Sequence, residues 1–145
     1  MSSTAHILIV EDNALVAKFY RMALERSGGF ACHVTEDLND MLALVRHGQA
    51  NLAIVDVSLS GTEWEGRMLD GVEVTRMLKA ASSRPLPVIL ATAHAMAGDR
   101  ERLLAASGAD GYLEKPIYEA DVLVAAVYKL LDEASLAPPS LPDSK

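Results

Sequence analysis

The feature that most constrains this chain's fold is the alternation of short apolar runs with longer segments of helical periodicity. Residues 6–10, 51–56 and 87–91 are predominantly apolar, as in strands that are covered on both faces of a sheet. Weaker strand-like runs lie at 30–34 and 111–113. Helical periodicity covers residues 13–27, 38–47, 71–81, 97–107 and 118–133. The alternation predicts βαβ units, and therefore an α/β protein whose five parallel strands are covered by helices on both faces.

The composition limits the kinds of partner that this protein can bind. The 145 residues suffice for one domain with a hydrophobic core, and the net charge is −7. This acidic balance argues against binding to nucleic acid or to an anionic membrane surface. No apolar run is long enough to span a membrane, the first residues lack a signal-peptide pattern, and the single Cys32 excludes an internal disulfide. We therefore expect a cytoplasmic protein, with a disordered proline- and serine-rich tail at 134–145.

Charged and hydroxyl side chains stand where the predicted strands end. These residues are Glu11, Asp12, Asp56, Thr92, Glu114 and Lys115. In an open parallel sheet the site lies outside the carboxyl ends of the strands, so we expect these side chains at one rim. Clustered carboxylates repel one another unless a cation lies among them, and their hard oxygen ligands suit Mg²⁺ or Mn²⁺. A carboxylate such as Asp56 can then act as a nucleophile and form an acyl phosphate.

Each of these residues taken alone has an ordinary structural explanation. Glu11 and Asp12 precede a helical segment and resemble an N-cap, and Asp56 could also be a cap. Thr92 could be a hydrogen-bonded hydroxyl within the fold, and Lys115 could belong to a surface loop. Their joint occurrence at successive strand ends favours a functional site.

Four segments resemble the receiver domain of two-component response regulators. They are "ILIVEDNALV", "LAIVDVSL", "DGVEVTRML" and "PVILATAHAMAGDRERLLAASGADGYLEKPI". The resemblance covers residues 5–133 and implies a flavodoxin-like (βα)5 doubly wound fold with strand order 2-1-3-4-5. It also implies a phosphorylation switch of bacterial two-component or phosphorelay signalling.

The resemblance assigns the phosphorylation and metal site. Asp56 corresponds to the phosphoacceptor, Asp12 to a direct ligand of Mg²⁺ or Mn²⁺, and Glu11 to an acid that acts through water. The backbone carbonyl of Ser58 corresponds to a further metal ligand. Lys115 corresponds to the lysine that pairs with the phosphoryl group.

The resemblance also assigns a switch and its modulators. Thr92 corresponds to the switch hydroxyl, and Tyr112 to the aromatic residue that changes rotamer on activation, although a packed strand tyrosine is an alternative. Ser58 and His94 occupy positions that tune hydrolysis of the phosphate in this family. Pro116 corresponds to the proline after the lysine, which is often preceded by a cis peptide bond.

The implied function is acceptance of a phosphoryl group from a sensor histidine kinase or histidine phosphotransfer protein. Phosphorylation would then change binding to a downstream protein target, without a DNA-binding output domain and without enzymatic turnover of an external substrate. A pseudo-receiver that binds partners without phosphorylation is the main alternative. A nucleotide or flavin module is disfavoured because no G-x-G-x-x-G follows the first strand. A metal-dependent phosphatase would need a second acid where Ser58 stands.

Two departures from the family pattern follow the predicted phosphoacceptor. Ser60 stands where the family usually has a proline. Residues 61–69 look like an insertion that includes Trp64 and precedes the helix beginning at Gly71. A tolerated surface loop is one interpretation. Contact with the kinase, or shielding of the acyl phosphate, is the other.

The last helical segment is apolar over more than one face. We expect the sheet to be covered by Val122, Leu123, Ala126, Val127 and Leu130. Val124, Tyr128 and Leu131 would remain available for a partner, which suggests a homodimer through this helix and its neighbours. Ala14 and Leu15 are candidates for a docking patch that receives a histidine-bearing helix.

Overall fold

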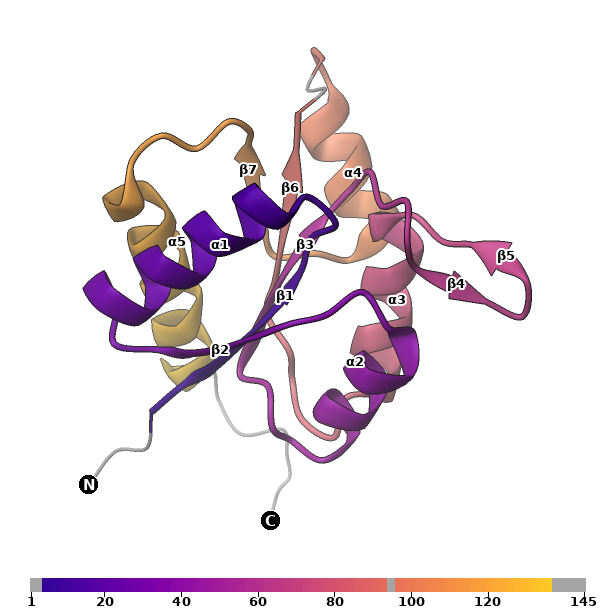
Figure 1. Ribbon diagram of the computed structural model, residues 1–145, viewed down its shortest axis with the longest axis horizontal. Helices are drawn as coiled ribbons and strands as arrows, with labels where there is room; N and C mark the ends of the chain where they lie inside the picture. Colours follow the sequence, from indigo (N-terminus) through magenta and orange to yellow (C-terminus); the bar gives the residue numbers. More distant parts are fainter. Residues whose placement is uncertain (1–3, 94–95, 137–145) are drawn as a thin grey trace.

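A parallel sheet forms the centre of the molecule (Figure 1). The computed structural model describes residues 4–93 and 96–136. The strands of this sheet are β1 (His6–Val10), β2 (Ala31–Val34), β3 (Leu52–Asp56), β6 (Val88–Thr92) and β7 (Gly111–Glu114). Their spatial order is β2-β1-β3-β6-β7, and every neighbouring pair is parallel. Counted among these five strands alone, the order is 2-1-3-4-5, which confirms the predicted flavodoxin-like fold.

Helices cover both faces of the sheet. They are α1 (Ala14–Met22), the π-helical turn η1 (Ala23–Ser27), α2 (Leu38–Arg46), α3 (Gly71–Ala81), α4 (Asp99–Ser107) and α5 (Ala120–Leu136). In Figure 1, α1 and α5 lie on one side of the sheet, and α2 and α3 lie on the other. Short parallel strands require such crossover helices, so the layering follows from the alternation in the sequence.

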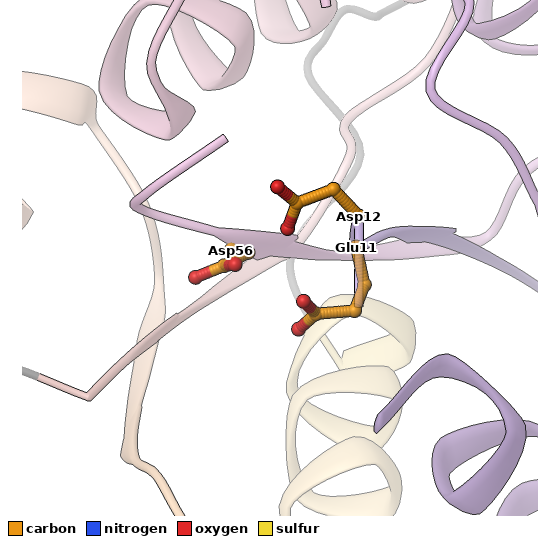
Figure 2. Close-up of side chains that lie close together, drawn as sticks. All are labelled: Glu11, Asp12 and Asp56. Carbon is orange, nitrogen blue, oxygen red and sulfur yellow. The ribbon is translucent and has the colours of Figure 1, made fainter. Parts of the chain in front are cut away.

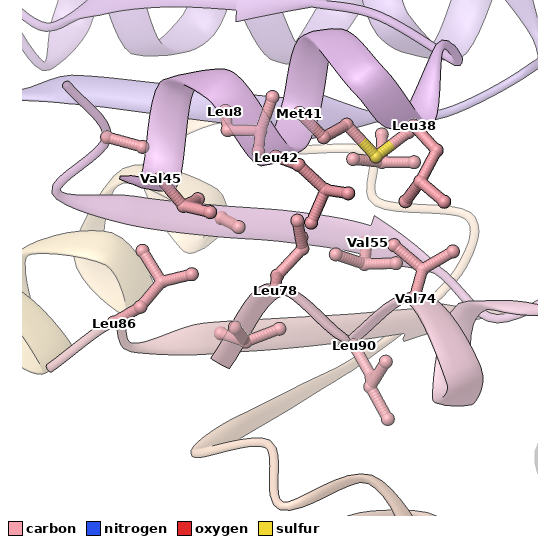
Figure 3. Packing of buried hydrophobic residues seen from close by; sticks show 14 of the residues in the cluster. Leu8, Leu38, Met41, Leu42, Val45, Val55, Val74, Leu78, Leu86 and Leu90 are labelled. Carbon is pink, nitrogen blue, oxygen red and sulfur yellow. The ribbon is translucent and has the colours of Figure 1, made fainter. Parts of the chain in front are cut away.

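The alternating side chains of β1 build a core on each face. Ile7 and Ile9 belong to the core under α1, η1 and α5. Leu8 and Val10 belong to the core under α2, α3 and α4, part of which is drawn in Figure 3. All four side chains are at most 1% exposed. Each contributes about 1.5–3 kcal/mol relative to an exposed position, so the apolar strands fix the sheet between two helical layers.

The last two helices differ in extent from the prediction. α5 continues to Leu136 and so includes residues 134–136, the first three of the predicted tail. The first helix-breaking residue in this region is Pro138, and the helix therefore runs past 133. Residues 137–145 of the predicted tail lie outside the described part of the chain. α4 begins only at Asp99 because its N-cap, Gly98, is left-handed with φ +85°.

The predicted apolar faces of α5 also need correction. Val122 is 47% exposed and does not cover the sheet, whereas Val124 is buried. The reason is that α5 packs against η1 as well as against the sheet, which buries a broader stripe of the helix. Tyr128 is half exposed, but its hydroxyl donates to the carbonyl of Gly28 at 2.7 Å, and its ring lies beside Phe30. The surface left for a partner is therefore smaller than the sequence suggested.

The insertion at 61–69 contains a β-hairpin. Its strands are β4 (Glu63–Trp64) and β5 (Arg67–Met68), and the hairpin projects away from the sheet (Figure 1). Glu65 and Gly66 have φ values of +53° and +79°, the sign that a two-residue type I′ turn requires at both positions. The insertion is thus an ordered hairpin at the surface, with all four strand residues exposed.

None of the helices in the described residues is long and apolar enough to cross a membrane.

Candidate functional site

The strand register brings the predicted acids to one rim of the sheet. Val10 pairs with Val55, so Glu11 and Asp12 follow β1 at the level where β3 ends in Asp56. The three carboxylates offer oxygen atoms that all lie within 4.8 Å of one another. Figure 2 shows the side chains of Glu11 and Asp12 leaving the end of β1 in different directions, with Asp56 beside them. This is the convergence that the strand-end argument predicted.

Lys115 supplies the positive charge on the buried side of this cluster. Its Nζ donates to Glu11 Oε1 at 2.9 Å and lies 3.4 Å from Asp56 Oδ2. The side chains of Lys115, Glu11 and Asp56 are only 14%, 1% and 6% exposed. The backbone N–H of Lys115 is held by the carbonyl of Thr92, at the end of the neighbouring β6. One ammonium therefore neutralises part of the charge of two buried carboxylates.

Glu11 is the carboxyl that burial affects most. Burial raises its pKa to about 7, and the hydrogen bond from Lys115 only partly opposes this. Burial by itself would lower the pKa of Lys115, but the hydrogen bond to Glu11 and the charge of Asp56 outweigh it and raise that pKa. Glu11 consequently exchanges a proton near neutral pH when no metal is bound.

Asp12 lies on the exposed side and behaves in the opposite way. The hydroxyl of Ser60 donates a hydrogen bond to Asp12 Oδ2 and lowers the pKa of this carboxyl, outweighing the partial burial. Asp12 is thus anionic throughout the neutral range, and its environment favours the charged form. The cluster combines one carboxyl that holds a proton readily with one that does not.

The structure rejects both capping alternatives for the acids. The N-cap of α1 is Asn13, whose side chain accepts from the backbone N–H groups of Leu15 and Val16. The N-cap of α3 is Asp70, which forms a capping box with Glu73. Asp56 and Asp12 are therefore not occupied in capping helices.

A glycine allows α3 to begin directly against the end of β3. A Cβ on Gly71 would lie 2.1 Å from the carbonyl oxygen of Asp56, which is far inside van der Waals contact. The N–H of Gly71 donates to the carbonyl of Val57 at 2.9 Å. Gly71 therefore holds the chain close behind the predicted phosphoacceptor, after the insertion has returned to the fold.

The other predicted site residues lie in or next to β3, β6 and β7. Thr92 is buried at the end of β6, and the N–H of Ser58 donates to Asp56 Oδ1 at 3.3 Å. The peptide bond between Lys115 and Pro116 is cis. Tyr112 lies in β7 and has a buried hydroxyl with no hydrogen-bond partner among the described residues; burial, and then the charge of Glu114, raises its pKa. His94 lies outside the described residues.

Ser60 is the site residue that the sequence analysis did not assign. It was noted only as a departure from the family pattern, yet its hydroxyl contacts Asp12 across 48 residues of sequence. The signal available was its position four residues after Asp56, where the family usually has a residue without a hydroxyl.

The chain belongs to the response regulator receiver domain family, which matches residues 7–128. It is similar to the polar-differentiation response regulator DivK of Brucella ovis, with 36% identity over 115 residues, which is 79% of this chain and 86% of DivK. DivK of Brucella anthropi is 37% identical over 112 residues, 77% of this chain and 84% of that protein. The bacterial relatives and the fold agree on a receiver of two-component signalling.

Solved structures support the same assignment. A CheY-like receiver domain protein from Methanospirillum hungatei matches with a TM-score of 0.74 and 25% identity, over 92% of this chain and 98% of that one. The receiver domain of a modulated diguanylate cyclase from Desulfovibrio desulfuricans matches with the same TM-score and 29% identity, over 92% and 98%. NtrX from Brucella abortus matches with a TM-score of 0.73 and 26% identity over 92% of this chain but only 28% of that longer one.

The acidic cluster suits a hard divalent cation. Its donors are carboxylate oxygens from Glu11, Asp12 and Asp56, which are the ligand type that Mg²⁺ and Mn²⁺ prefer. Lys115 compensates only part of the negative charge, since its contacts are with Glu11 and Asp56. The donor set and the excess of negative charge both fit a divalent metal.

Proposed function

We propose that this protein is a phosphoacceptor response regulator whose receiver domain, residues 5–133, is phosphorylated on Asp56. The observation that carries the proposal is the grouping of three carboxylates within 4.8 Å, with Lys115 in contact with two of them. Such a group lies at the carboxyl ends of parallel strands, where sites occur in this class of fold. The membership in the receiver family points to the same chemistry.

In the proposed reaction Asp56 is the nucleophile. One of its carboxylate oxygens attacks the phosphorus of a phosphohistidine on a sensor kinase or a phosphotransfer protein. The P–N bond breaks as the P–O bond forms, and the imidazole leaves. Lys115 is already within 3.4 Å of Asp56 and would pair with the phosphoryl oxygens. The hydroxyl of Thr92, at the end of the adjacent strand, is the proposed second partner of those oxygens.

Glu11, Asp12, Asp56 and the backbone carbonyl of Ser58 are the proposed holders of Mg²⁺ or Mn²⁺. The metal would neutralise the carboxylates and the incoming phosphoryl group, which otherwise repel each other. The protein's own contribution is to hold Asp56 at the end of the buried strand β3 and to keep Lys115 beside it. Later hydrolysis of the acyl phosphate, tuned by Ser58 and His94, would reset the switch.

The proposed output is a change in protein contacts. Thr92 would respond to the phosphoryl group, and Tyr112 would change rotamer and alter the surface formed by α4, β7 and α5. The hydroxyl of Tyr112 has no hydrogen-bond partner among the described residues, which supports this, because a buried hydroxyl without a hydrogen bond is costly and can gain one on moving. A downstream protein target, and not an external substrate, would read the change. We place this activity in the bacterial cytoplasm.

The proposed site for the phosphodonor lies beside α1. Leu15 is 80% exposed and lines a groove with Phe19, Ile117 and Lys115, next to the acidic cluster. A helix that carries the donor histidine could bury these apolar side chains while its phosphoryl group reaches Asp56.

The decisive experiment is intact-mass measurement after incubation with Mg²⁺ and acetyl phosphate. The wild type should gain one phosphoryl group, and Asp56→Asn should gain none. Asp132→Asn, at an exposed position in α5, is the matched control and should behave as wild type. No adduct on the wild type, despite measured Mg²⁺ binding, would favour a pseudo-receiver that works without phosphorylation. An adduct on Asp56→Asn would mean that another carboxylate is the acceptor.

We include in the same proposal a homodimer that forms through α5. The exposed apolar surface of α5 is smaller than the sequence predicted. Val122 and Tyr128 are the exposed large apolar side chains that α5 retains among its described positions. Light scattering with and without phosphorylation should detect a dimer that Val122→Lys weakens. Monomer under both conditions would remove this part of the proposal.

A further inference from the structure

Asp12 has a partner that comes from a distant part of the chain. Ser60 is exposed at the start of the insertion, and its hydroxyl donates to Oδ2 of Asp12. Asp12 is less buried than Glu11 and Asp56, so packing alone restrains its carboxylate least. Among the interactions that act on this carboxylate, the hydrogen bond from the Ser60 hydroxyl has the largest effect on its pKa.

The backbone around Ser60 is anchored in the fold. Two residues further on, the hydroxyl of the buried Thr62 donates to the carbonyl of Glu36 at 2.8 Å. The carbonyl of Thr62 accepts from the N–H of Leu69 at 2.9 Å, and Leu69 is 1% exposed in the core. These contacts close the base of the hairpin and fasten the chain just after Ser60 to the loop between β2 and α2.

A carboxylate can serve two partners at once. It has two oxygens with about four lone-pair directions, so Asp12 can accept from Ser60 and still offer an oxygen to a cation. Hydrogen bonds of this kind orient metal-binding carboxylates, and their loss typically weakens metal affinity 10–100-fold.

We propose that Ser60 is a positioning residue for the metal site, whose hydroxyl orients the Asp12 carboxylate toward a divalent cation held by the acidic cluster. This inference rests on the proposed function, in which that cluster binds Mg²⁺. The insertion then has a structural task beside the site, because its closed base holds Ser60 in place.

The test is Mg²⁺ titration of the full chain by calorimetry. Ser60→Ala should bind Mg²⁺ about tenfold more weakly than the wild type. Ser60→Thr retains a hydroxyl and should recover most of the affinity. Ser83→Ala is the matched control, since Ser83 is an exposed serine on the loop after α3 and should leave the affinity unchanged.

A kinetic measurement separates positioning from a general structural effect. With acetyl phosphate as donor, Ser60→Ala should need about tenfold more Mg²⁺ for half-maximal phosphorylation, while the rate at saturating Mg²⁺ stays at the wild-type value. Equal or tighter Mg²⁺ binding by Ser60→Ala, beside normal wild-type binding, would overturn the role of Ser60 and leave the proposed function standing. A wild type that binds no Mg²⁺ would overturn the metal site itself and this inference with it.

Discussion

Glu11 and Asp12 are adjacent in sequence, yet they lie on opposite sides of the acidic cluster and differ in burial, in hydrogen-bond partner and in pKa. Glu11 is buried and paired with Lys115, and its pKa is raised to about 7. Asp12 is partly exposed and accepts from Ser60, and its pKa is lowered. Burial decides the difference, because removing a carboxylate from water costs more than one ammonium contact returns.

The two sides of the cluster therefore have different roles in the site. The buried side, Glu11 with Lys115, balances charge inside the fold and controls how readily a proton is held. The exposed side, Asp12 with Ser60, presents a permanent anion at the rim. Asp56 lies between them, in contact with Lys115 and within reach of both acids. We therefore expect changes on the buried side to affect folding most, and changes on the exposed side to affect metal binding most.

Removing the cation from the buried side should have the largest effect on stability. Lys115→Met leaves Glu11 and Asp56 close together without a compensating charge, and breaking a buried pair typically costs 3–5 kcal/mol. Because Glu11 can take up a proton, we expect a loss of about 3 kcal/mol at pH 8 and a smaller loss at pH 5. Urea unfolding at the two pH values measures this; equal losses at both would contradict the role of Glu11 ionisation.

The pH dependence of the metal-free protein should carry the signature of Glu11. Its folded-state pKa of about 7 lies above the ordinary value of 4.5, so the folded state binds more protons than the unfolded state between these values. Stability should fall by about 3 kcal/mol as pH rises from about 4.5 through 7, and then level off. Glu11→Gln should lack this component, and saturating Mg²⁺ should suppress it in the wild type. A wild-type curve that parallels Glu11→Gln in urea unfolding would refute the assignment.

On the exposed side we expect a small effect on stability and a large effect on Mg²⁺ binding. Asp12→Asn should change the free energy of unfolding by less than about 1 kcal/mol, because its contact with Ser60 is at the surface. The same substitution should weaken Mg²⁺ binding by at least about tenfold, since it removes a charged ligand. Calorimetry and urea unfolding of one preparation give both values. A destabilisation as large as that of Lys115→Met would show that the two sides are equivalent.

The smallest effect is expected at the tip of the hairpin. Residues 63–68 can be replaced by Asn-Gly, because Thr62 and Leu69 are already hydrogen-bonded at the base. If the base alone holds Ser60, Mg²⁺ affinity should stay within about twofold and stability within about 1 kcal/mol. This variant lacks Trp64, the only tryptophan of the chain, so its unfolding has to be measured by circular dichroism and not by tryptophan fluorescence. A changed phosphate lifetime or phosphotransfer specificity would instead assign the tip to shielding or to kinase contact.

Much of the fold could be predicted because its signals are local. Runs such as 51–56 and 87–91 have the composition of doubly covered strands, and the structure places β3 and β6 there at the centre of the sheet. The face that α5 buries could not be predicted in the same way. Val122 and Val124 have identical side chains, and the packing of α5 against the sheet and η1 decides which of them is covered.

The sequence by itself determined that carboxylates, a hydroxyl and an ammonium would meet at one rim, because parallel strands end on the same side of a sheet. Tertiary structure alone decided which acid is buried with Lys115 and which meets Ser60. Those contacts join residues separated by 104 and 48 positions, and no local periodicity encodes them. Burial and long-range hydrogen bonds set the charge state of each carboxyl, and they exist only once the strands and the insertion have come together.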